Sequence, residues 1–450
     1  MISKIFLILS LALSSSMASV PHDVWLLEVA GPIGPATADY VVNTLAAAED
    51  AAAELVVLQM NTPGGLDRAM RDIIQAILAA QVPVVTYVAP QGSRAASAGT
   101  YILYASHLAA MAPATNLGAA TPIMIGGLPK LPGSEPESPQ RGDDSQQDGQ
   151  SQPLSPEATM HSKMVNDAQA YIRSLAELRG RNAEWAVEAV KDAATLTAQE
   201  ALELNVIDLV AKDTPALLEA LDGRTVLVDG QPRVLDLAGA NLHAVVPGWR
   251  TEFLRVVTNP SVAYLLLLVG IYGLIFEFSS PGMGAGGIIG GICLLIALYA
   301  MQLLPISYSA LALMLLGLGL MAAEALSPSF GVLGIGGIAA FMIGSIMLMD
   351  ADVPGFRIAL PVILALTTVS VGVLILVLNL LLRARKQPVV SGSSTLVGET
   401  ADVVDSAGDD VHVCLHGEIW RVDCPDPLQT GDRVRIKKVS GLLLDVEKKD

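Results

Sequence analysis

The residues with the clearest capacity for chemistry form a run of small side chains around one serine. Ser97 stands in the segment Gly92–Thr100, GSRAASAGT, which follows an apolar run typical of a buried strand. An apolar helical stretch from Tyr101 to Ala105 comes next, so the serine is expected at a helix N-terminus. Free backbone N–H groups and the positive end of the helix dipole stabilise an anion there. Ser97 is therefore a candidate nucleophile, and the alternative is an ordinary helix N-cap.

A serine needs a neighbouring base before it can attack a carbonyl carbon. The region before the membrane-proximal tail holds three histidines, His22, His107 and His161, and His107 begins an apolar strand that favours a structural role. Lys163 follows on a helix expected from Ala158 to Arg179. A lysine acts as a base where burial lowers its pKa, whereas composition alone favours a solvated surface lysine here.

Two further groups of residues have spacings that suggest chemistry. Asn61-Thr62-Pro63-Gly64-Gly65 follows an expected strand, where paired glycines allow backbone N–H groups to approach a ligand, although the motif alone is a common turn. His412, Cys414 and His416 alternate along another strand, as zinc ligands can. The spacing lacks a Cys-x-x-Cys pair, so a strand with a valine and leucine core face is the preferred interpretation. We expect no metal and no other cofactor.

The elements that must position Ser97 alternate between strands and helices. Residues 22–235 contain three apolar strand-like runs, VWLLEVAG, LVVLQM and VPVVTYVA, separated by amphipathic stretches. This alternation predicts an α/β domain with a parallel sheet covered by helices, and its expected limits are 19–240. Residues 126–157 are rich in Pro, Gly, Ser, Gln and Asp, so they are expected to form a disordered insert. Residues 1–18 have the pattern of a secretory signal peptide, and the alternative is an uncleaved anchor helix.

The later part of the chain is strongly apolar. Its expected membrane domain, residues 255–386, contains five apolar segments, each about 20 residues long, the length that crosses a bilayer. Arg383, Arg385 and Lys386 follow the fifth segment, which places that end in the cytoplasm by the positive-inside rule. Five spans from an exported start also end inside, although Arg250 and Arg255 precede the first span on the outer side.

Spans one and three resemble each other when the chain is shifted by 47 residues, which overlays Gly270 on Gly317 and Glu277 on Glu324. A Gly-Gly-Ile follows each copy, three residues out of register. Each Glu begins a Glu-x-x-Ser-Pro element at a helix end, which indicates a duplicated hairpin. We expect each carboxylate to accept hydrogen bonds in the turn that follows, and the alternative is an interfacial Glu in water.

Residues 391–450 form short β-type runs separated by turns, which predict a small β-barrel. They hold twelve acidic residues against seven Lys and Arg, and the whole chain has a formal net charge of −17. Binding to the phosphate backbone of nucleic acid needs clustered positive charge. This domain therefore favours a protein partner, and we expect no nucleic-acid partner.

Several motifs together resemble a known protease family. NTPGG, SRAASAGTYI and TLTAQEALELNVID look like the core shared by the NfeD family and bacterial signal peptide peptidases, a branch of the Clp-protease/crotonase superfamily. The likeness continues through NPSVAYLLLLVGIYGLIFEF and AEALSPSFG into GEIWRV, so it covers essentially the whole mature chain. It is the long form of the family that the chain resembles.

The resemblance implies a Clp-protease/crotonase-like domain, a multispan membrane domain and a C-terminal OB-like barrel. It also implies a serine protease with a Ser–Lys dyad. The family pattern places the nucleophile at Ser97 and the base at Lys163, eight residues before Tyr171-Ile172-Arg173-Ser174. The oxyanion-hole positions fall on Gly64, Gly65 and Ala98. The insert before Lys163 is longer than in the family pattern, which puts the geometry of the dyad in question.

The implied substrate is an apolar peptide segment of a stomatin/prohibitin-type membrane partner. A homo-oligomer in the bacterial inner (plasma) membrane is expected, with the protease domain periplasmic and the barrel cytoplasmic. Two alternatives remain. One is a catalytically silent scaffold that organises stomatin-like proteins, and the other is a crotonase-type acyl-CoA enzyme, which should lack the exported location and the Ser–Lys pair.

Overall fold

The computed structural model describes residues 23–122, 156–279, 284–327, 329–349, 355–386, 396–407 and 410–449. The expected signal peptide lies outside these residues, and so does the expected insert except for its last two positions, which open helix α5. Contacts divide the chain into two units, 1–320 with 332–368 and 321–331 with 369–450.

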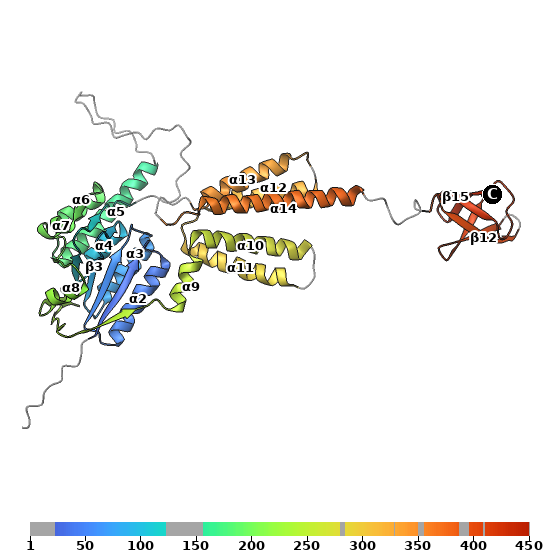
Figure 1. The fold of residues 1–450 in the computed structure, drawn as a ribbon. Helices are drawn as coiled ribbons and strands as arrows, with labels where there is room; N and C mark the ends of the chain where they lie inside the picture. The colour runs from blue at the N-terminus through green and yellow to red at the C-terminus, as the bar shows by residue number, and fades with distance from the viewer. Residues whose placement is uncertain are drawn as a thin grey trace, which may run out of the picture. The chain divides into compact units, whose positions relative to one another are not determined.

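A six-stranded sheet forms the centre of the first unit, and all its strand pairs are parallel (Figure 1). Every residue of the third expected run is buried, as in sheets that are covered on both faces. The expectation of a parallel α/β sheet is confirmed. In spatial order the strands are β11 (Asn241–Val245), β1 (Asp23–Ala30), β2 (Leu55–Asn61), β3 (Val84–Val88), β5 (Leu108–Met111) and β8 (Leu209–Val210).

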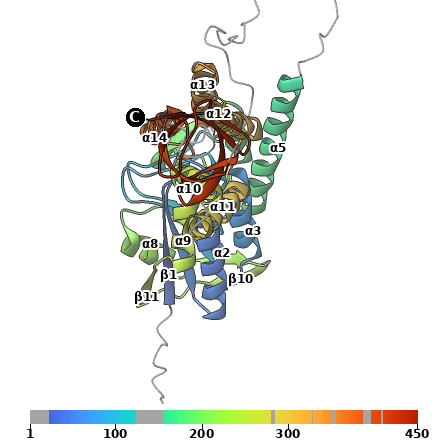
Figure 2. The ribbon, with the colours of Figure 1, turned by 90° about the vertical axis from the view of Figure 1, so that its right-hand side faces the viewer.

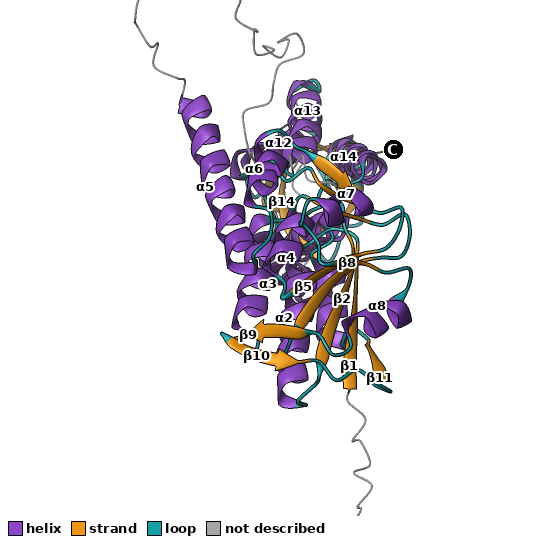
Figure 3. Cartoon of the chain, turned by 90° about the vertical axis from the view of Figure 1, so that its left-hand side faces the viewer, coloured by secondary structure: helices purple, strands orange, loops and turns teal. Residues whose placement is uncertain are grey.

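Helices cover both faces of this sheet. Helix α8 and the β9–β10 hairpin lie in front of the sheet in Figure 3, and Leu217, Leu221 and Val226 join the sheet residues in one buried apolar cluster. The other face is covered by helices that follow β1, β2 and β4. The bounds are α2 (Pro35–Asp50), α3 (Asp67–Ala79), α4 (Ala98–Ala105), α8 (Thr214–Leu221), β9 (Thr225–Val228) and β10 (Gln231–Val234).

Two features of this domain differ from the sequence-based expectation. A small second sheet brings together β4 (Arg94–Ala96), β6 (Asn116–Gly118) and β7 (Thr195–Thr197). Strand β11 pairs with β1, with Val245 opposite Leu27, so the domain extends beyond the expected boundary at residue 240. Both pairings are non-local, and such short runs have no pattern that marks them as strands. The remaining helices are α5 (Pro156–Arg179), α6 (Ala183–Lys191) and α7 (Ala198–Glu203).

Helices occupy all five expected membrane segments. Four of them are long and apolar enough to cross a bilayer, whereas α13 has 16 residues. A helix of that length spans about 24 Å, short of the roughly 30 Å hydrocarbon core. The helices are α9 (Trp249–Val257), which precedes the spans, α10 (Pro260–Ser279), α11 (Ala285–Leu303), α12 (Tyr308–Leu326), α13 (Val332–Met347) and α14 (Leu360–Lys386).

Close helix packing supports the duplicated hairpin. A Cβ added to Gly270 would lie 2.9 Å from the backbone N of Leu294, so these helices touch through their backbones. A Cβ on Gly317 would collide in the same way with the backbone N of Phe341. The shift of 47 residues that carries the first glycine to the second also carries Leu294 to Phe341. The two helix contacts therefore follow the same shift of 47 residues. The two Gly-Gly-Ile runs do not follow it, so they are not equivalent positions.

The two matched glutamates cap the turns that follow them, as expected, but unequally. Glu324 is 2% exposed and accepts bonds from Ser329 N at 2.9 Å, Gly331 N at 3.1 Å and Ser329 Oγ at 2.6 Å. Glu277 accepts one bond among the described residues, from Gly287 N at 3.3 Å. A buried carboxylate that loses a hydrogen bond costs more than a partly exposed one, which water can still satisfy.

We expect Glu324→Gln to lower the thermal stability of the purified full-length protein more than Glu277→Gln. A hydrogen bond to a charged group is worth about 1.5–3 kcal/mol, so the first change should cost about 2 kcal/mol. The second should cost less, because Glu277 is partly exposed and water can replace its partner. Thermal melts in the same lipid nanodiscs measure both. Equal stabilities of both variants and the parent would show that these caps do not stabilise the bundle.

The C-terminal part of the second unit is a closed five-stranded barrel in the order β12-β13-β14-β16-β15. Its single parallel pair joins β14 to β16, and this arrangement is OB-like, as expected. Val413 and Leu415 point into the core, in agreement with the structural interpretation of that strand. The strands are β12 (Thr400–Ala407), β13 (Asp410–Leu415), β14 (Glu418–Asp423), β15 (Arg433–Ser440) and β16 (Leu443–Lys448).

Candidate active site

Ser97 occupies an unusual backbone conformation at the junction of β4 and α4. Its φ is 52° and its ψ is −116°, a region that L-residues rarely adopt. Its N–H donates to Gly118 O at 2.9 Å, and its carbonyl accepts from Thr100 N at 2.9 Å. The side chain makes no cap hydrogen bond and is half-buried. The ordinary N-cap interpretation is therefore wrong, because the Ser97 hydroxyl accepts no hydrogen bond from the N–H groups of the first turn of α4.

The Asn61–Gly65 motif is fastened to the strand that carries this serine. Thr62 N donates to Arg94 O at 2.8 Å, and Ala96 N donates to Thr62 O at 3.1 Å. These bonds place Gly64 directly beside Ser97, so that a Cβ on Gly64 would lie 2.8 Å from Ser97 Cβ. Gly64 also has a φ of 118°, so any side chain here would be strained as well as crowded.

The backbone donors around Ser97 are not equivalent. Gly64 N donates to Thr62 Oγ1 at 3.1 Å and is already engaged. For Gly65 N and Ala98 N, no acceptor occurs within the described part of the chain. Ala98 is the first residue of α4, where helix geometry leaves N–H groups without an intrahelical partner. The N–H groups of Gly65 and Ala98 are thus available for an oxyanion beside Ser97. Gly64 has no side chain that would fill the space next to them.

Lys163 lies on α5 and is exposed. The structure does not bring it into contact with Ser97, and within the described residues it forms no ion pair or hydrogen bond. The helix is docked one turn later, where Asp167 accepts a bond of 2.9 Å from Arg71 on α3, and Arg71 lies over the ring of Tyr171 at 4.6 Å. Figures 2 and 3 show the first turns of α5 extending past the rest of the domain.

The docking contacts nevertheless fix the position of Lys163 along the helix axis relative to Ser97. Tyr171 stacks on Tyr101 with ring centroids 6.1 Å apart, and Arg179 Nε donates to Ala105 O at 2.8 Å, so α5 and α4 run in the same direction. Lys163 lies about 12 Å before Tyr171 along the helix axis, and Ser97 about 6 Å before Tyr101. The two residues are therefore offset by about 6 Å along the helix axes, and the lateral separation of packed helices, about 8–10 Å, adds to the distance between them.

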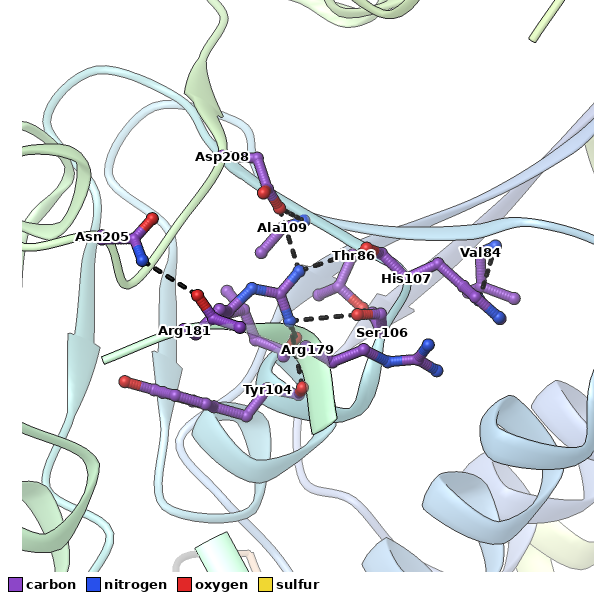
Figure 4. Close-up of polar contacts among 12 residues, drawn as sticks. Val84, Thr86, Tyr104, Ser106, His107, Ala109, Arg179, Arg181, Asn205 and Asp208 are labelled. Carbon is purple, nitrogen blue, oxygen red and sulfur yellow. Dashed lines mark hydrogen bonds and ion pairs between the residues drawn. The ribbon is translucent and has the colours of Figure 1, made fainter. Parts of the chain in front are cut away.

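A buried arginine holds the far end of α4 (Figure 4). Arg181 Nη1 donates to the carbonyls of Leu103, Tyr104 and Ser106 at 3.0–3.1 Å, and Nη2 bonds to Asp208 Oδ2 at 2.9 Å. Cationic donors at a helix C-terminus stabilise its last carbonyls and its dipole. Arg181 therefore fixes the helix whose first turn carries Ser97. Sequence reasoning missed it, and the available signal was its place between a helix-ending Gly180 and the N-cap Asn182.

His107 has the structural role expected for it. It is buried, and its Nδ1 accepts a bond of 3.2 Å from Val84 N on β3. Burial first, and then the positive charges of Arg179 and Arg181, lower the pKa of His107 to about 3. The imidazole is therefore neutral and belongs to the packing beneath α4, away from the chemistry at Ser97.

We expect this histidine to make the fold sensitive to acid. An unfolded His has a pKa near 6.5, so between about pH 6.5 and pH 3 the unfolded chain binds one more proton at this position. Stability should fall with decreasing pH in that window by up to about 1.4 kcal/mol per unit, and this contribution is constant above it. His107→Gln should narrow the gap between melting temperatures at about pH 7.5 and about pH 5. The exposed His161→Gln serves as control, and an unchanged gap in His107→Gln would contradict the assignment.

Three family models match successive parts of the chain. Residues 23–129 match the N-terminal domain of NfeD1b, residues 261–380 the NfeD integral membrane domain, and residues 393–448 the NfeD-like C-terminal, partner-binding domain. Together they cover the α/β domain up to the start of the insert, the membrane helices and the barrel.

Individual relatives extend over most of the chain. The membrane-bound protease PH1510 of Pyrococcus horikoshii is 31% identical over 434 residues, which are 94% of this chain and 92% of that protein. Membrane protein NfeD1b of Bacillus subtilis is 28% identical over 341 residues, 75% of this chain and 70% of that protein. A solved structure of a lysine-to-alanine mutant of the 1510-N membrane-bound stomatin-specific protease, in complex with a substrate peptide, is 33% identical. It covers 52% of this chain and 97% of that chain, with a TM-score of 0.43.

Proposed function

This chain belongs to the NfeD family of membrane proteins, and on that premise we propose that it is a membrane-bound serine endopeptidase. Ser97 would be the nucleophile and Lys163 the general base. The observation that carries the proposal is the strained backbone of Ser97 beside Gly64, at a helix N-terminus with two available N–H groups. Strain of this kind is costly and concentrates at functional sites.

The proposed reaction is acyl transfer to the serine and then to water. Neutral Lys163 takes the hydroxyl proton of Ser97 while Ser97 Oγ attacks the carbonyl carbon of a peptide bond. The N–H groups of Gly65 and Ala98 donate to the developing oxyanion, a contact worth about 100- to 1000-fold in rate per donor. The protonated lysine gives its proton to the leaving amine, and water then hydrolyses the acyl-enzyme. Gly64 has no donor role in this scheme, because its N–H is bonded to Thr62.

The exposure of Lys163 favours a closing step. A lysine is a base only when its neutral form is populated, and removal from water favours that form. We propose that a bound peptide covers the first turns of α5 and brings the side chain the remaining distance to Ser97. The same exposure is the observation that favours the second candidate, a catalytically silent scaffold that organises stomatin-like proteins.

A fluorophosphonate probe separates these two functions. Such a probe reacts with an activated serine whether or not the natural substrate is known. The full-length protein should be labelled, and Ser97→Ala should not be. Labelling of Ser97→Ala would show that Ser97 is not the nucleophile. If the parent were not labelled, with or without peptide, the result would favour the scaffold.

The proposed substrate is an apolar segment of a stomatin/prohibitin-type membrane protein, which the family resemblance implies. The match of residues 393–448 to a partner-binding domain supports a role for the barrel in recruiting that protein.

A homo-oligomer is also proposed. The chain is a membrane protein with four candidate spans among its described helices, and we propose that it lies in the bacterial inner membrane with the protease domain outside.

Topology can be read with reporters at two positions. A reporter fused after Lys386 should be active only in the cytoplasm, and one inserted within residues 126–157 only outside, because basic residues end the last span. This outcome requires the short α13 to cross with local bilayer thinning, a modest cost. If both reporters were active outside, the protein would have four spans, and the cytoplasmic barrel would be wrong.

A further inference from the structure

Helix α9 presents an apolar row to its surroundings immediately before the first membrane span. Trp249, Phe253 and Val256 follow at helical spacing and are 83%, 45% and 54% exposed. A neighbouring side of the same helix is buried through Leu254 and Val257. Large exposed side chains aligned on one face of a short helix mark an interaction surface. We name Trp249, Phe253 and Val256 the α9 apolar row.

The polar residues of α9 are already engaged within the protein. Arg250 Nε lies 3.4 Å from Asp39 Oδ1, and Thr251 Oγ1 donates to Asp39 Oδ2 at 3.1 Å, which ties the helix to α2. Arg255 Nε donates to Glu252 Oε2 at 3.1 Å. Both arginines are 71% exposed, but each is paired with a carboxylate, so their positive charge is offset and the α9 apolar row remains the unpaired part of the surface.

The position of α9 next to a membrane span indicates that the bilayer surface is its partner. Only Thr258 and Asn259 separate α9 from α10. This helix has 20 residues, contains an 18-residue window with a mean hydropathy of 2.0 and is long enough to cross a bilayer. Helix α9 packs against the ends of both α10 and α11 and runs across them (Figure 1). A helix across the ends of membrane spans lies along the membrane surface, where Trp and Phe are favoured.

We propose that α9 is an interfacial helix whose apolar row inserts into the boundary between headgroups and acyl chains of the lipid bilayer. The insertion is apolar in character, because the charge of each arginine is offset by a paired carboxylate. This inference does not rest on proteolysis, since it concerns a surface outside the residues around Ser97.

The docking has a consequence for the orientation of the α/β domain. Strand β11 runs parallel to β1, so the chain leaves the carboxyl edge of the sheet and reaches α9 within residues 246–248. Gly64 follows β2, which ends at the same edge, and Ser97 lies beside Gly64. An α9 held in the interface therefore turns that edge toward the membrane surface. Apolar segments that emerge from the bilayer would meet it first.

Tryptophan fluorescence tests the insertion directly. The full-length protein is reconstituted in phosphatidylcholine vesicles whose acyl chains carry bromine close to the headgroup, and its emission is compared with that in unbrominated vesicles. The chain has four tryptophans, so the contribution of Trp249 is the difference between the parent and Trp249→Phe. A mild aromatic substitution at this exposed position should leave the protein folded. Trp25→Phe, which changes a strand residue whose ring lies 5.4 Å from that of His243 in a tilted arrangement, is the matched control.

We expect brominated lipid to quench a component of the emission that is lost in Trp249→Phe and kept in Trp25→Phe. Bromine near the headgroup should quench that component more strongly than bromine near the chain ends, and aqueous iodide should quench it weakly. If brominated lipid left the Trp249 component unchanged while iodide quenched it, the helix would lie in water and the proposal would be overturned. Neither outcome depends on whether Ser97 is catalytic.

Discussion

Ser97→Ala is expected to reduce hydrolysis of an apolar peptide by the full-length protein by roughly a thousandfold or more, since loss of a nucleophile removes the covalent route. The protein should stay folded. The hydroxyl makes no cap hydrogen bond, and alanine meets the same backbone conformation as serine at a φ of 52°. Peptide cleavage followed by mass spectrometry measures activity, and a thermal melt measures folding.

Ser93→Ala is the matched control for this experiment. Ser93 lies four residues earlier and is 2% exposed, so it tests whether loss of any serine hydroxyl in this loop disturbs the site. We expect Ser93→Ala to keep most of the activity. Turnover in Ser97→Ala close to that of the parent would rule out the proposed nucleophile.

Lys163→Ala is expected to reduce turnover by about 100- to 10,000-fold, the range of general acid–base catalysis. Lys163→Arg should be nearly as inactive, because a guanidinium keeps its proton and cannot serve as base. Both variants should melt like the parent, since Lys163 is exposed and, within the described part of the chain, makes no ion pair or hydrogen bond.

Lys191→Ala provides the control for removal of an exposed lysine. Lys191 lies in the last turn of α6, on the same domain, and should be dispensable. If Lys163→Arg retained parental turnover, positive charge alone would suffice, and Lys163 would bind or steer substrate without acting as base. Parental turnover in Lys163→Ala would remove it from the mechanism altogether.

Features that depend on local pattern could be predicted well. The strands before Ser97 are continuous apolar runs, α3 has buried residues at helical spacing, and the membrane segments are long apolar stretches between turn residues. These periodicities follow from how a helix or strand exposes its side chains, and they need no knowledge of the rest of the fold. The same holds for the Glu324 cap, whose donors lie within seven residues of it.

Local pattern was enough to predict the class of the domain, the place of Ser97 before a helix and the glycines that follow β2. Packing between distant segments places Gly64 against Ser97, engages Gly64 N with Thr62 and leaves Lys163 exposed. The same kind of packing brings Arg181 to the C-terminal end of α4 and pairs β11 with β1 in the sheet. Each of these depends on segments far apart in the chain that pack together or stay apart, and no local spacing encodes that choice.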